Sequence, residues 1–223
     1  GPAGKLVAVG REGGVVKAYV DHPEADAPIR TSDGKLDVGA VVGSDGTLTV
    51  VKDLGLREPY VGQCPLASGE IAQDLALYYA ESEQQPTLLS LGVLIQTDGS
   101  VQAAGGLLVQ PMPGCSEEVL DCLEFRSPLY ADMSGHMAAE EQPEALLELF
   151  FSGLSPKALD KGVPRFACDC SRARIERVLL SLGRQELQDM IDQDGQAQVH
   201  CHFCQKDYDF DKAQLQALLE ATE

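Results

Sequence analysis

The chain has 223 residues, 44% of them hydrophobic and 23% charged, which is enough apolar material for a globular core and argues against wholesale disorder. Its formal net charge of -18, from 35 acidic and 17 basic residues, argues against nucleic acid and anionic lipid surfaces as partners. The sequence shows no signal peptide and no run near the roughly 20 apolar residues that cross a bilayer, so we expect a cytoplasmic protein without a membrane partner.

Apolar runs separated by short turns with glycine predict an antiparallel sheet in the first half of the chain. Asp98-Gly99 is one such turn, because Asp-Gly favours the positive backbone angles of a tight hairpin. Ser68 is the predicted N-cap of a helix whose apolar face includes Ile71 and Tyr78. The strand pairs that we expect are 5–9 with 15–20, 39–42 with 47–51, and 88–96 with 101–110.

Residues 116–160 differ in character, because ten acidic residues stand there against only Arg126 and Lys157. Helical pieces are predicted on both sides of residues 133–139, which have little to anchor them. Such a segment is marginally stable unless it packs on a neighbour. The sequence leaves two interpretations open, a switchable linker and an ordinary helical connector.

The last part of the chain is predicted to be mainly helical. Ser171 is the expected cap of one helix and Asp211 of the final one. The apolar face that we expect on the first of these helices comprises Ile175, Val178, Leu179 and Leu182. Because such apolar faces are few here, a unit of this size needs a cross-link or a bound metal to fold.

The predicted fold class is therefore α+β. We expect an antiparallel-sheet N-terminal domain with helices over residues 1–114, an acidic helical linker over 115–160, and a small, mainly helical zinc domain over 161–223.

Four of the seven cysteines stand in two tight pairs, which does not fit a secreted disulfide framework. The second pair has the spacing of a zinc knuckle, and four sulfurs complete a tetrahedral site, so Zn²⁺ is the predicted cofactor. An iron–sulfur cluster and unrelated buried thiols are the alternatives. His200 and His202 are expected to support the site or face solvent rather than to bind the metal. The metal ligands that we predict are Cys168, Cys170, Cys201 and Cys204.

Four thiolates around one zinc leave a charge of about -2. Arg165, Arg172, Arg174 and Lys206 are expected to compensate this charge, and Asp169 to oppose them. Thiolates are the form that oxidants attack.

Neighbouring sulfurs can close as Cys168 to Cys170 and Cys201 to Cys204, which removes metal ligands. Because structural zinc contributes roughly 10 to 16 kcal/mol to such small domains, its loss should unfold this one. A structural zinc site without any switch is the alternative interpretation.

The sequence resembles the heat-shock-protein-33 family of redox-regulated chaperones, which is found mainly in bacteria. The motifs that carry the resemblance are the two cysteine pairs, Cys170-Ser171-Arg172, residues 179–183, Tyr208 and Phe210, and residues 59–63, 68–72 and 104–107. The resemblance implies an ATP-independent holdase that is quiet when reduced and zinc-bound. Peroxide, hypochlorite or oxidation with heat would then oxidise the four cysteines to two disulfides, release zinc and unfold the linker. The active form would bind unfolding or oxidatively damaged client proteins and form a homodimer.

Several features depart from the family's pattern. Cys64, Cys115 and Cys122 lie outside it and are expected to be buried spectators. The chain begins at Gly1-Pro2 with residues like the family's interior, so we expect that an N-terminal piece of the first domain is missing.

Two rival functions remain. One is a constitutive structural zinc ribbon that acts in regulation or binds nucleic acid, and the other is a thiol-disulfide oxidoreductase. The sequence shows no Ser-His-Asp set, phosphate loop or HExxH motif, so no enzyme is predicted.

Overall fold

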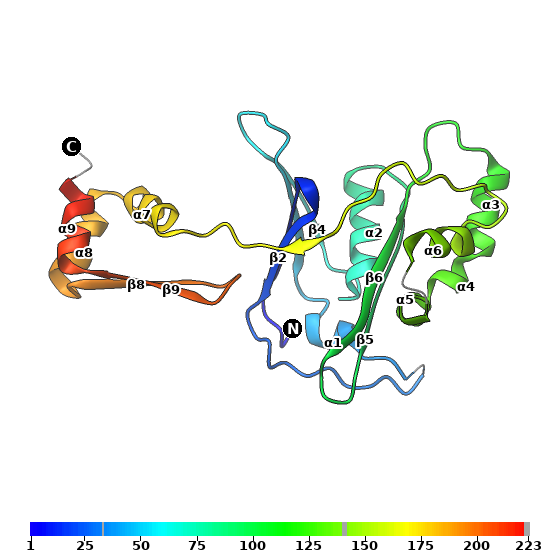
Figure 1. Cartoon of the computed structure of the whole chain (residues 1–223), viewed down its shortest axis with the longest axis horizontal. Helices are drawn as coiled ribbons and strands as arrows, with labels where there is room; N and C mark the ends of the chain where they lie inside the picture. The colour runs from blue at the N-terminus through cyan, green and yellow to red at the C-terminus, as the bar shows by residue number, and fades with distance from the viewer. Residues whose placement is uncertain (33, 140–141, 221–223) are drawn as a thin grey trace. The chain divides into compact units, whose positions relative to one another are not determined.

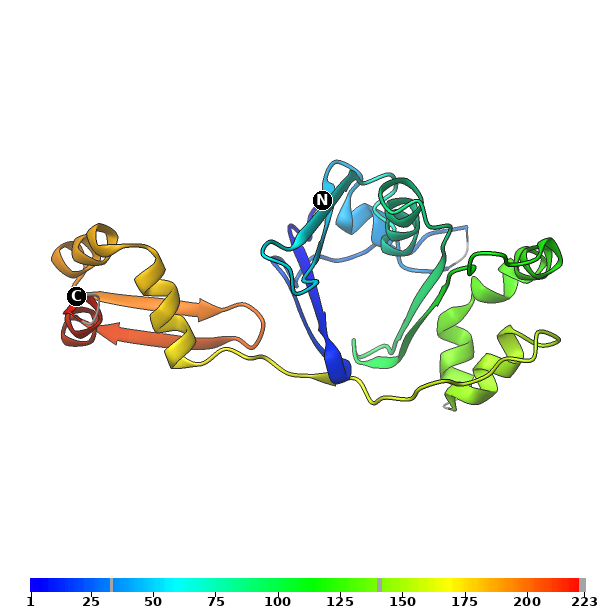
Figure 2. The same cartoon turned by 90° about the horizontal axis from the view of Figure 1, so that it is seen from above.

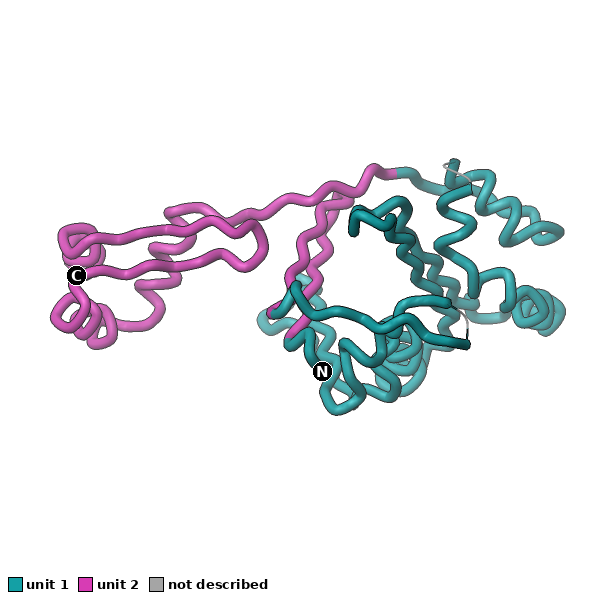
Figure 3. The backbone as a smooth tube through the Cα atoms, turned by 90° about the horizontal axis from the view of Figure 1, so that it is seen from below, with its two compact units in different colours: residues 1–4, 22–161 teal, residues 5–21, 162–223 magenta. Residues whose placement is uncertain are grey.

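The computed structural model describes residues 1–32, 34–139 and 142–220. These divide into two compact units, which Figure 3 colours separately. Unit 1 comprises residues 1–4 and 22–161, and unit 2 comprises residues 5–21 and 162–223. Glu140 and Glu141, two of the ten acidic residues of the predicted linker, lie outside the described residues.

Unit 1 contains two antiparallel strand pairs and a long helix (Figure 1). β5 (Leu88–Ile95) pairs with β6 (Val101–Val109), as the Asp98-Gly99 turn predicts, with a register shift between Leu94 and Ile95. β3 (Thr47–Lys52) pairs with β4 (Tyr60–Pro65). α2 (Ile71–Ser82) is the helix expected after Ser68.

The prediction of a strand over residues 39–42 is wrong, because this segment forms the short helix α1 (Val38–Val42). Asp37 caps it by accepting a hydrogen bond from the Ala40 N–H, at 3.0 Å. Gly43 ends it with a φ of 80°, a value that favours glycine. The partner of β3 is therefore β4, which the hairpin pattern did not indicate.

The prediction of Ser68 as the N-cap of α2 is wrong, because the N-cap is Glu70, and a buried carboxylate holds the turn that precedes the helix. Asp74, only 2% exposed, accepts hydrogen bonds from the backbone N–H groups of Ala67, Ser68 and Gly69 at 2.9 to 3.0 Å. Charge-assisted bonds of this kind fix a turn firmly. The predicted apolar face is half right, since Tyr78 is fully buried whereas Ile71 is 40% exposed.

The acidic segment is helical and well anchored. Its helices are α3 (Glu117–Phe125), α4 (Ser127–Tyr130), α5 (Met133–Ala139) and α6 (Pro143–Phe150). Tyr130, Met133, Leu146 and Phe150 form a buried apolar cluster.

Residues 133–139, expected to have little to anchor them, instead lie on the β5–β6 pair. α5 contacts both strands, and Gly92 and Gly105 allow the close approach. A Cβ at Gly92 would lie 2.5 Å from the Ser134 nitrogen, and one at Gly105 would lie 2.6 Å from the Met137 Cε. Met133 is only 1% exposed.

Unit 2 joins the start of the chain to its end. β1 (Leu6–Arg11) and β2 (Val15–Val20) form an antiparallel hairpin through the 3-10 turn Glu12–Gly14. β2 also pairs in parallel with the two-residue strand β7 (Arg165–Phe166). This three-stranded sheet is the only one in the described part of the chain whose strands are so far apart in sequence.

The C-terminal part of unit 2 packs helices around a second hairpin (Figure 2). Its elements are α7 (Arg172–Ser181), α8 (Arg184–Gln193), β8 (Gln196–Cys201), β9 (Lys206–Asp211) and α9 (Lys212–Glu220). The hairpin makes this part less helical than expected. The buried core comprises Ile175, Leu179, Leu187, Ile191, Phe210, Leu215 and Leu219.

Both predicted caps are confirmed here. Ser171 accepts from the Arg174 N–H at 3.3 Å, and Asp211 accepts from the Gln214 N–H at 2.8 Å. The predicted face of α7 is only partly right, because Val178 and Leu182 are nearly half exposed. Among the described helices, we find none with the length and hydropathy to cross a membrane.

Candidate metal centre

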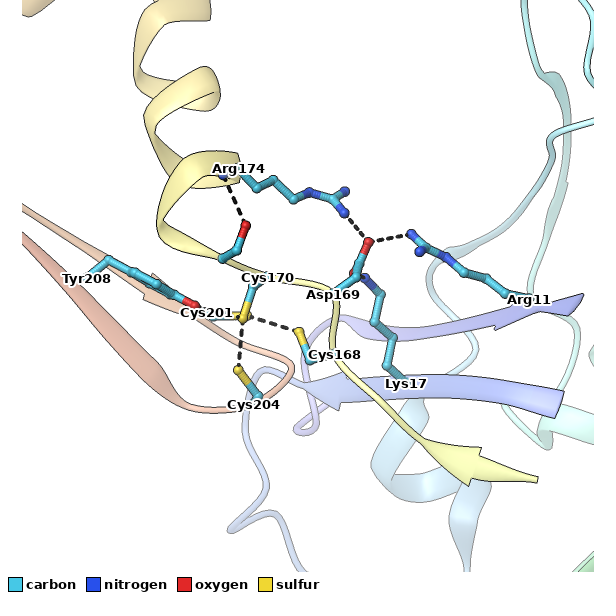
Figure 4. A network of polar contacts seen from close by, with 10 residues as sticks. Arg11, Lys17, Cys168, Asp169, Cys170, Arg174, Cys201, Cys204 and Tyr208 are labelled. Carbon is cyan, nitrogen blue, oxygen red and sulfur yellow. Dashed lines mark hydrogen bonds and ion pairs between the residues drawn. The ribbon is translucent and has the colours of Figure 1, made fainter. Parts of the chain in front are cut away.

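The two cysteine pairs meet at one point of unit 2 (Figure 4). Cys168 and Cys170 lie in the short loop between β7 and α7, while Cys201 ends β8 and Cys204 follows in the turn to β9. The β8–β9 register pairs Cys201 with Lys206, so Cys201 and Cys204 lie at the same end of this hairpin. All four side chains are half-buried, and all seven cysteines of the chain are free.

The sulfur positions fit a tetrahedral metal ion. The four Sγ atoms lie within 4.8 Å of one another, with 3.6 Å between Cys168 and Cys201 and 3.2 Å between Cys170 and Cys204. Zinc–sulfur bonds of about 2.3 Å in a tetrahedron place the sulfurs roughly 3.8 Å apart. The donor set therefore fits a soft divalent ion, and zinc as the particular metal remains a prediction.

A tyrosine on β9 tunes one of the thiols. The Tyr208 hydroxyl donates to Cys170 Sγ at 3.1 Å. This bond, helped by Cys204, lowers the pKa of Cys170 to about 7, while the hydrogen bond with Cys170 and burial raise the pKa of Cys204 to about 12. Burial also raises the pKa of Cys168. Of Cys168, Cys170 and Cys204, Cys170 is thus the thiol that ionises at the lowest pH.

Asp169 gathers the positive charge of the centre instead of opposing it. Its carboxylate forms ion pairs with Lys17 and Arg174, and with Arg11 at 2.8 Å (Figure 4). The hydrogen bond from Lys17 is the main reason that the pKa of Asp169 lies well below its usual range. Asp169 therefore holds three cations at the middle position of the first cysteine pair.

Of the cations expected from sequence to offset the thiolate charge, Arg172 is engaged elsewhere. Its guanidinium donates to the Asp209 carbonyl at 3.1 Å and to Gln214 at 2.9 Å, and it lies 4.3 Å from the Phe210 ring centroid. Arg174 does lie beside the centre, through Asp169. Sequence reasoning missed Lys17 and Arg11, which are more than 150 positions from the cysteines.

One signal for Lys17 was present in the sequence. It is a lysine at an inward position of an apolar strand, and it is only 8% exposed. Period-two alternation places it on the same face of β2 as Val15 and Tyr19. A charged residue in such a place calls for a buried partner.

The histidines and the remaining cysteines have other surroundings. His200 is hydrogen-bonded to Asp207 at 2.7 Å, and the His202 ring stacks on Tyr19. The described residues bring no histidine into the sulfur cluster. Cys64 is buried on β4, as expected, whereas Cys115 and Cys122 are only half-buried.

Fold and site together define a two-unit α+β protein with a candidate four-thiolate metal centre. Residues 1–211 match the family model described as Hsp33 protein. The chain is 45% identical to the "33 kDa chaperonin" of Alkaliphilus oremlandii, over 98% of this chain and 73% of that protein. It is 43% identical to the protein of the same name from Clostridium perfringens, over 93% of this chain and 66% of that protein.

A solved structure agrees with these matches. The crystal structure of the 33 kDa chaperonin (heat shock protein 33 homolog) from Thermotoga maritima superposes with a TM-score of 0.83 and 36% sequence identity. The match covers all of this chain and 75% of the other. This chain belongs to the Hsp33 family, and the resemblance and the α+β fold class predicted from sequence are both confirmed. It is therefore a member of a chaperone family, whose relatives named above are 33 kDa chaperonins.

Proposed function

We propose that the chain is an ATP-independent holdase whose client binding is switched on when its four paired cysteines are oxidised and zinc is released. The single observation that carries this proposal is the gathering of Cys168, Cys170, Cys201 and Cys204 Sγ atoms within 4.8 Å. A bound zinc ion would hold all four sulfurs as thiolates.

Oxidation acts on the cysteines themselves. Two thiolates, Cys168 with Cys170 or Cys201 with Cys204, give up two electrons and form one disulfide. Hydrogen peroxide accepts the two electrons together with two protons from solvent, its O–O bond breaks, and two waters leave. Once both disulfides have formed, no thiolate remains to hold the metal, and the folding free energy supplied by its binding is lost.

The signal then passes along the chain. We propose the division into residues 1–114, 115–160 and 161–223, with the middle segment as the switchable linker. Residues 155–164 form no helix or strand and lead directly into β7. Loss of order in residues 161–223, the C-terminal module, would therefore remove the anchor at this end of the acidic segment. Release of α5 would uncover Met133 and the face of β5–β6 beneath it.

Unfolding and oxidatively damaged proteins are the proposed clients, with a homodimer as the proposed oxidised form. We place the protein in the cytoplasm, without nucleic-acid or membrane partners. A constitutive zinc ribbon, including one that binds nucleic acid, is the alternative. It would keep its metal after mild oxidation, or bind nucleic acid at low salt despite the net charge of -18.

The test combines zinc content, thiol count and client aggregation, before and after peroxide treatment at mild heat. We expect release of about one zinc per chain, loss of four thiols, and suppression of aggregation only in the oxidised sample. Cys201→Ser should bind zinc weakly and lose the peroxide dependence. Cys64→Ser is the matched control, because Cys64 is buried on β4 of unit 1, and it should behave like the unmodified protein. Equally strong suppression by the reduced, zinc-loaded protein would rule out the switch.

A further inference from the structure

The β1–β2 hairpin carries no cysteine, yet it contacts both cysteine pairs within unit 2. Lys17 of β2 donates to Asp169, the middle residue of the first pair, and its Nζ lies 4.6 Å from the ring centroid of Phe203 in the second. The Tyr19 ring centroid lies 5.3 Å from that of His202 and 5.0 Å from that of Phe203. One face of one strand therefore touches the middle residues of both pairs.

Lys17 makes this contact sensitive to the arrangement of the cysteines. Its side chain is buried, and a buried ammonium is stable only with partners. Those partners are the Asp169 carboxylate and the Phe203 ring. Because each partner is flanked by cysteines, separation of the two pairs would take at least one of them away from Lys17.

Backbone pairing between β2 and β7 provides a second, direct connection between the hairpin and the first cysteine pair. Val15 and Val16 pair with Arg165 and Phe166 of β7, and the Ala167 N–H donates to the Val16 carbonyl at 3.0 Å. Ala167 is the residue directly before Cys168. A movement of the first cysteine pair is therefore transmitted to β2 through a single residue.

We propose that the β1–β2 hairpin is a component of the cysteine switch, with Asp169 as the positioning residue that couples the two. The hairpin docks while both cysteine pairs are gathered at one centre and is released when they part. Release frees Arg11 and Lys17 from Asp169 and leaves the β2 edge next to β7 unpaired. This inference rests on the proposed function, because it assumes that a metal gathers the cysteines.

Hydrogen exchange on the full chain tests the docking. Zinc-loaded and chelator-treated samples are compared, both fully reduced, so that no thiol changes its oxidation state. We expect the amides of residues 6–20 to exchange at least about tenfold faster after metal removal. A chain that binds zinc and is switched on by peroxide, while these amides keep their protection, would overturn the inference and leave the proposed function standing. A chain that binds no zinc would overturn both.

Variants test the role assigned to Asp169. Asp169→Asn should raise hairpin exchange about tenfold with zinc still bound, since it removes charge-assisted hydrogen bonds. Glu186→Gln also replaces a carboxylate with its amide, but at an exposed position of α8, so it is the matched control and should have no effect.

Lys17→Met removes the buried ammonium at a position far from the cysteines in sequence. If Asp169→Asn loses its metal, hairpin exchange in Lys17→Met tests the Asp169–Lys17 contact instead. The two substitutions together should have little more effect than either alone. Fully additive effects on exchange would contradict the coupling, as would unchanged hairpin protection in both single variants.

Discussion

Helix α5 and the Cys168–Cys170 loop are each held against a β-hairpin, but by different forces. α5 lies on β5–β6 through apolar packing, with Met133 buried and Gly92 and Gly105 making room for the helix backbone and Met137. The loop is held against β1–β2 by the ion pairs of Asp169 and by two backbone ladder positions.

Because the forces differ, the two contacts respond to different changes in the molecule. Apolar packing depends on volume and buried area, and the hydrophobic effect that drives it has no preferred direction. Charge-assisted hydrogen bonds depend on position and direction, so they report movement of the sulfurs that flank Asp169. The contact of the loop is therefore suited to sensing movement of the cysteines, whereas the contact of α5 responds to loss of buried apolar area.

Metal removal should have the largest effect of all these tests, because it should destabilise the C-terminal module and leave β5–β6 intact. A chelator applied to the reduced, zinc-loaded protein should cost the C-terminal module on the order of 10 kcal/mol. We expect loss of helical circular dichroism and rapid exchange in α7, α8 and α9, while β5–β6 keeps its protection. The opposite pattern, with a stable C-terminal module after zinc loss, would mean that its apolar core suffices without the metal.

Met133→Ala should release α5 without touching the cysteines. Truncation of this buried side chain should destabilise the packing by about 3 kcal/mol. Faster exchange in α5 and increased binding of an apolar dye in the reduced state are the expected readouts. Met112→Ala is the matched control, because Met112 is 77% exposed. Equal effects of the two substitutions would contradict the claim that apolar packing of Met133 holds α5 on β5–β6.

Gly92→Ala should push α5 away from the strand. Its Cβ would lie 2.5 Å from the Ser134 backbone nitrogen, so we expect a cost of about 2 kcal/mol. Gly10→Ala on β1 is the control, since its Cβ would meet nothing within 4 Å. Thermal unfolding of both variants measures the difference, and an unchanged melting temperature for Gly92→Ala would show that the helix adjusts freely.

Glu83→Gln tests a polar contact of unit 1 that involves no cysteine. Glu83 forms an ion pair with Lys52, whose hydrogen bond lowers the pKa of Glu83. A carboxylate with a lowered folded-state pKa stabilises the protein fully above the unfolded value of about 4.3, and this stabilisation is lost as the pH falls from there through the lower folded-state pKa. We expect Glu83→Gln to cost about 1 kcal/mol at pH 7 and progressively less below pH 4.3. Denaturant unfolding across this range checks it, and a constant difference would exclude the ionic origin.

Much of the candidate centre could be predicted from sequence, because its four cysteines carry their spacing with them. The β5–β6 hairpin and the caps at Ser171 and Asp211 were equally local signals. The helix α1 was missed because its few apolar residues suit a strand and a helix alike, and only Asp37 and Gly43 decide the matter.

What sequence reasoning could not supply were the long-range partners. Nothing near Asp169 indicates Lys17, and nothing in residues 133–139 indicates that Gly92 and Gly105 leave space for them. Such pairings depend on which surfaces meet in three dimensions. Sequence periodicity shows which side of an element is buried, but it does not identify what covers that side.

The distance along the chain between Lys17 and Asp169 has a consequence during synthesis. They are 152 positions apart, and a ribosome adds roughly 5 to 20 residues per second. Lys17 therefore leaves the exit tunnel about 8 to 30 s before Asp169 does. Throughout that interval the nascent strand lacks the Asp169 carboxylate that pairs with its lysine and lacks the β7 strand beside its edge, so unit 2 cannot close before Asp169 has emerged.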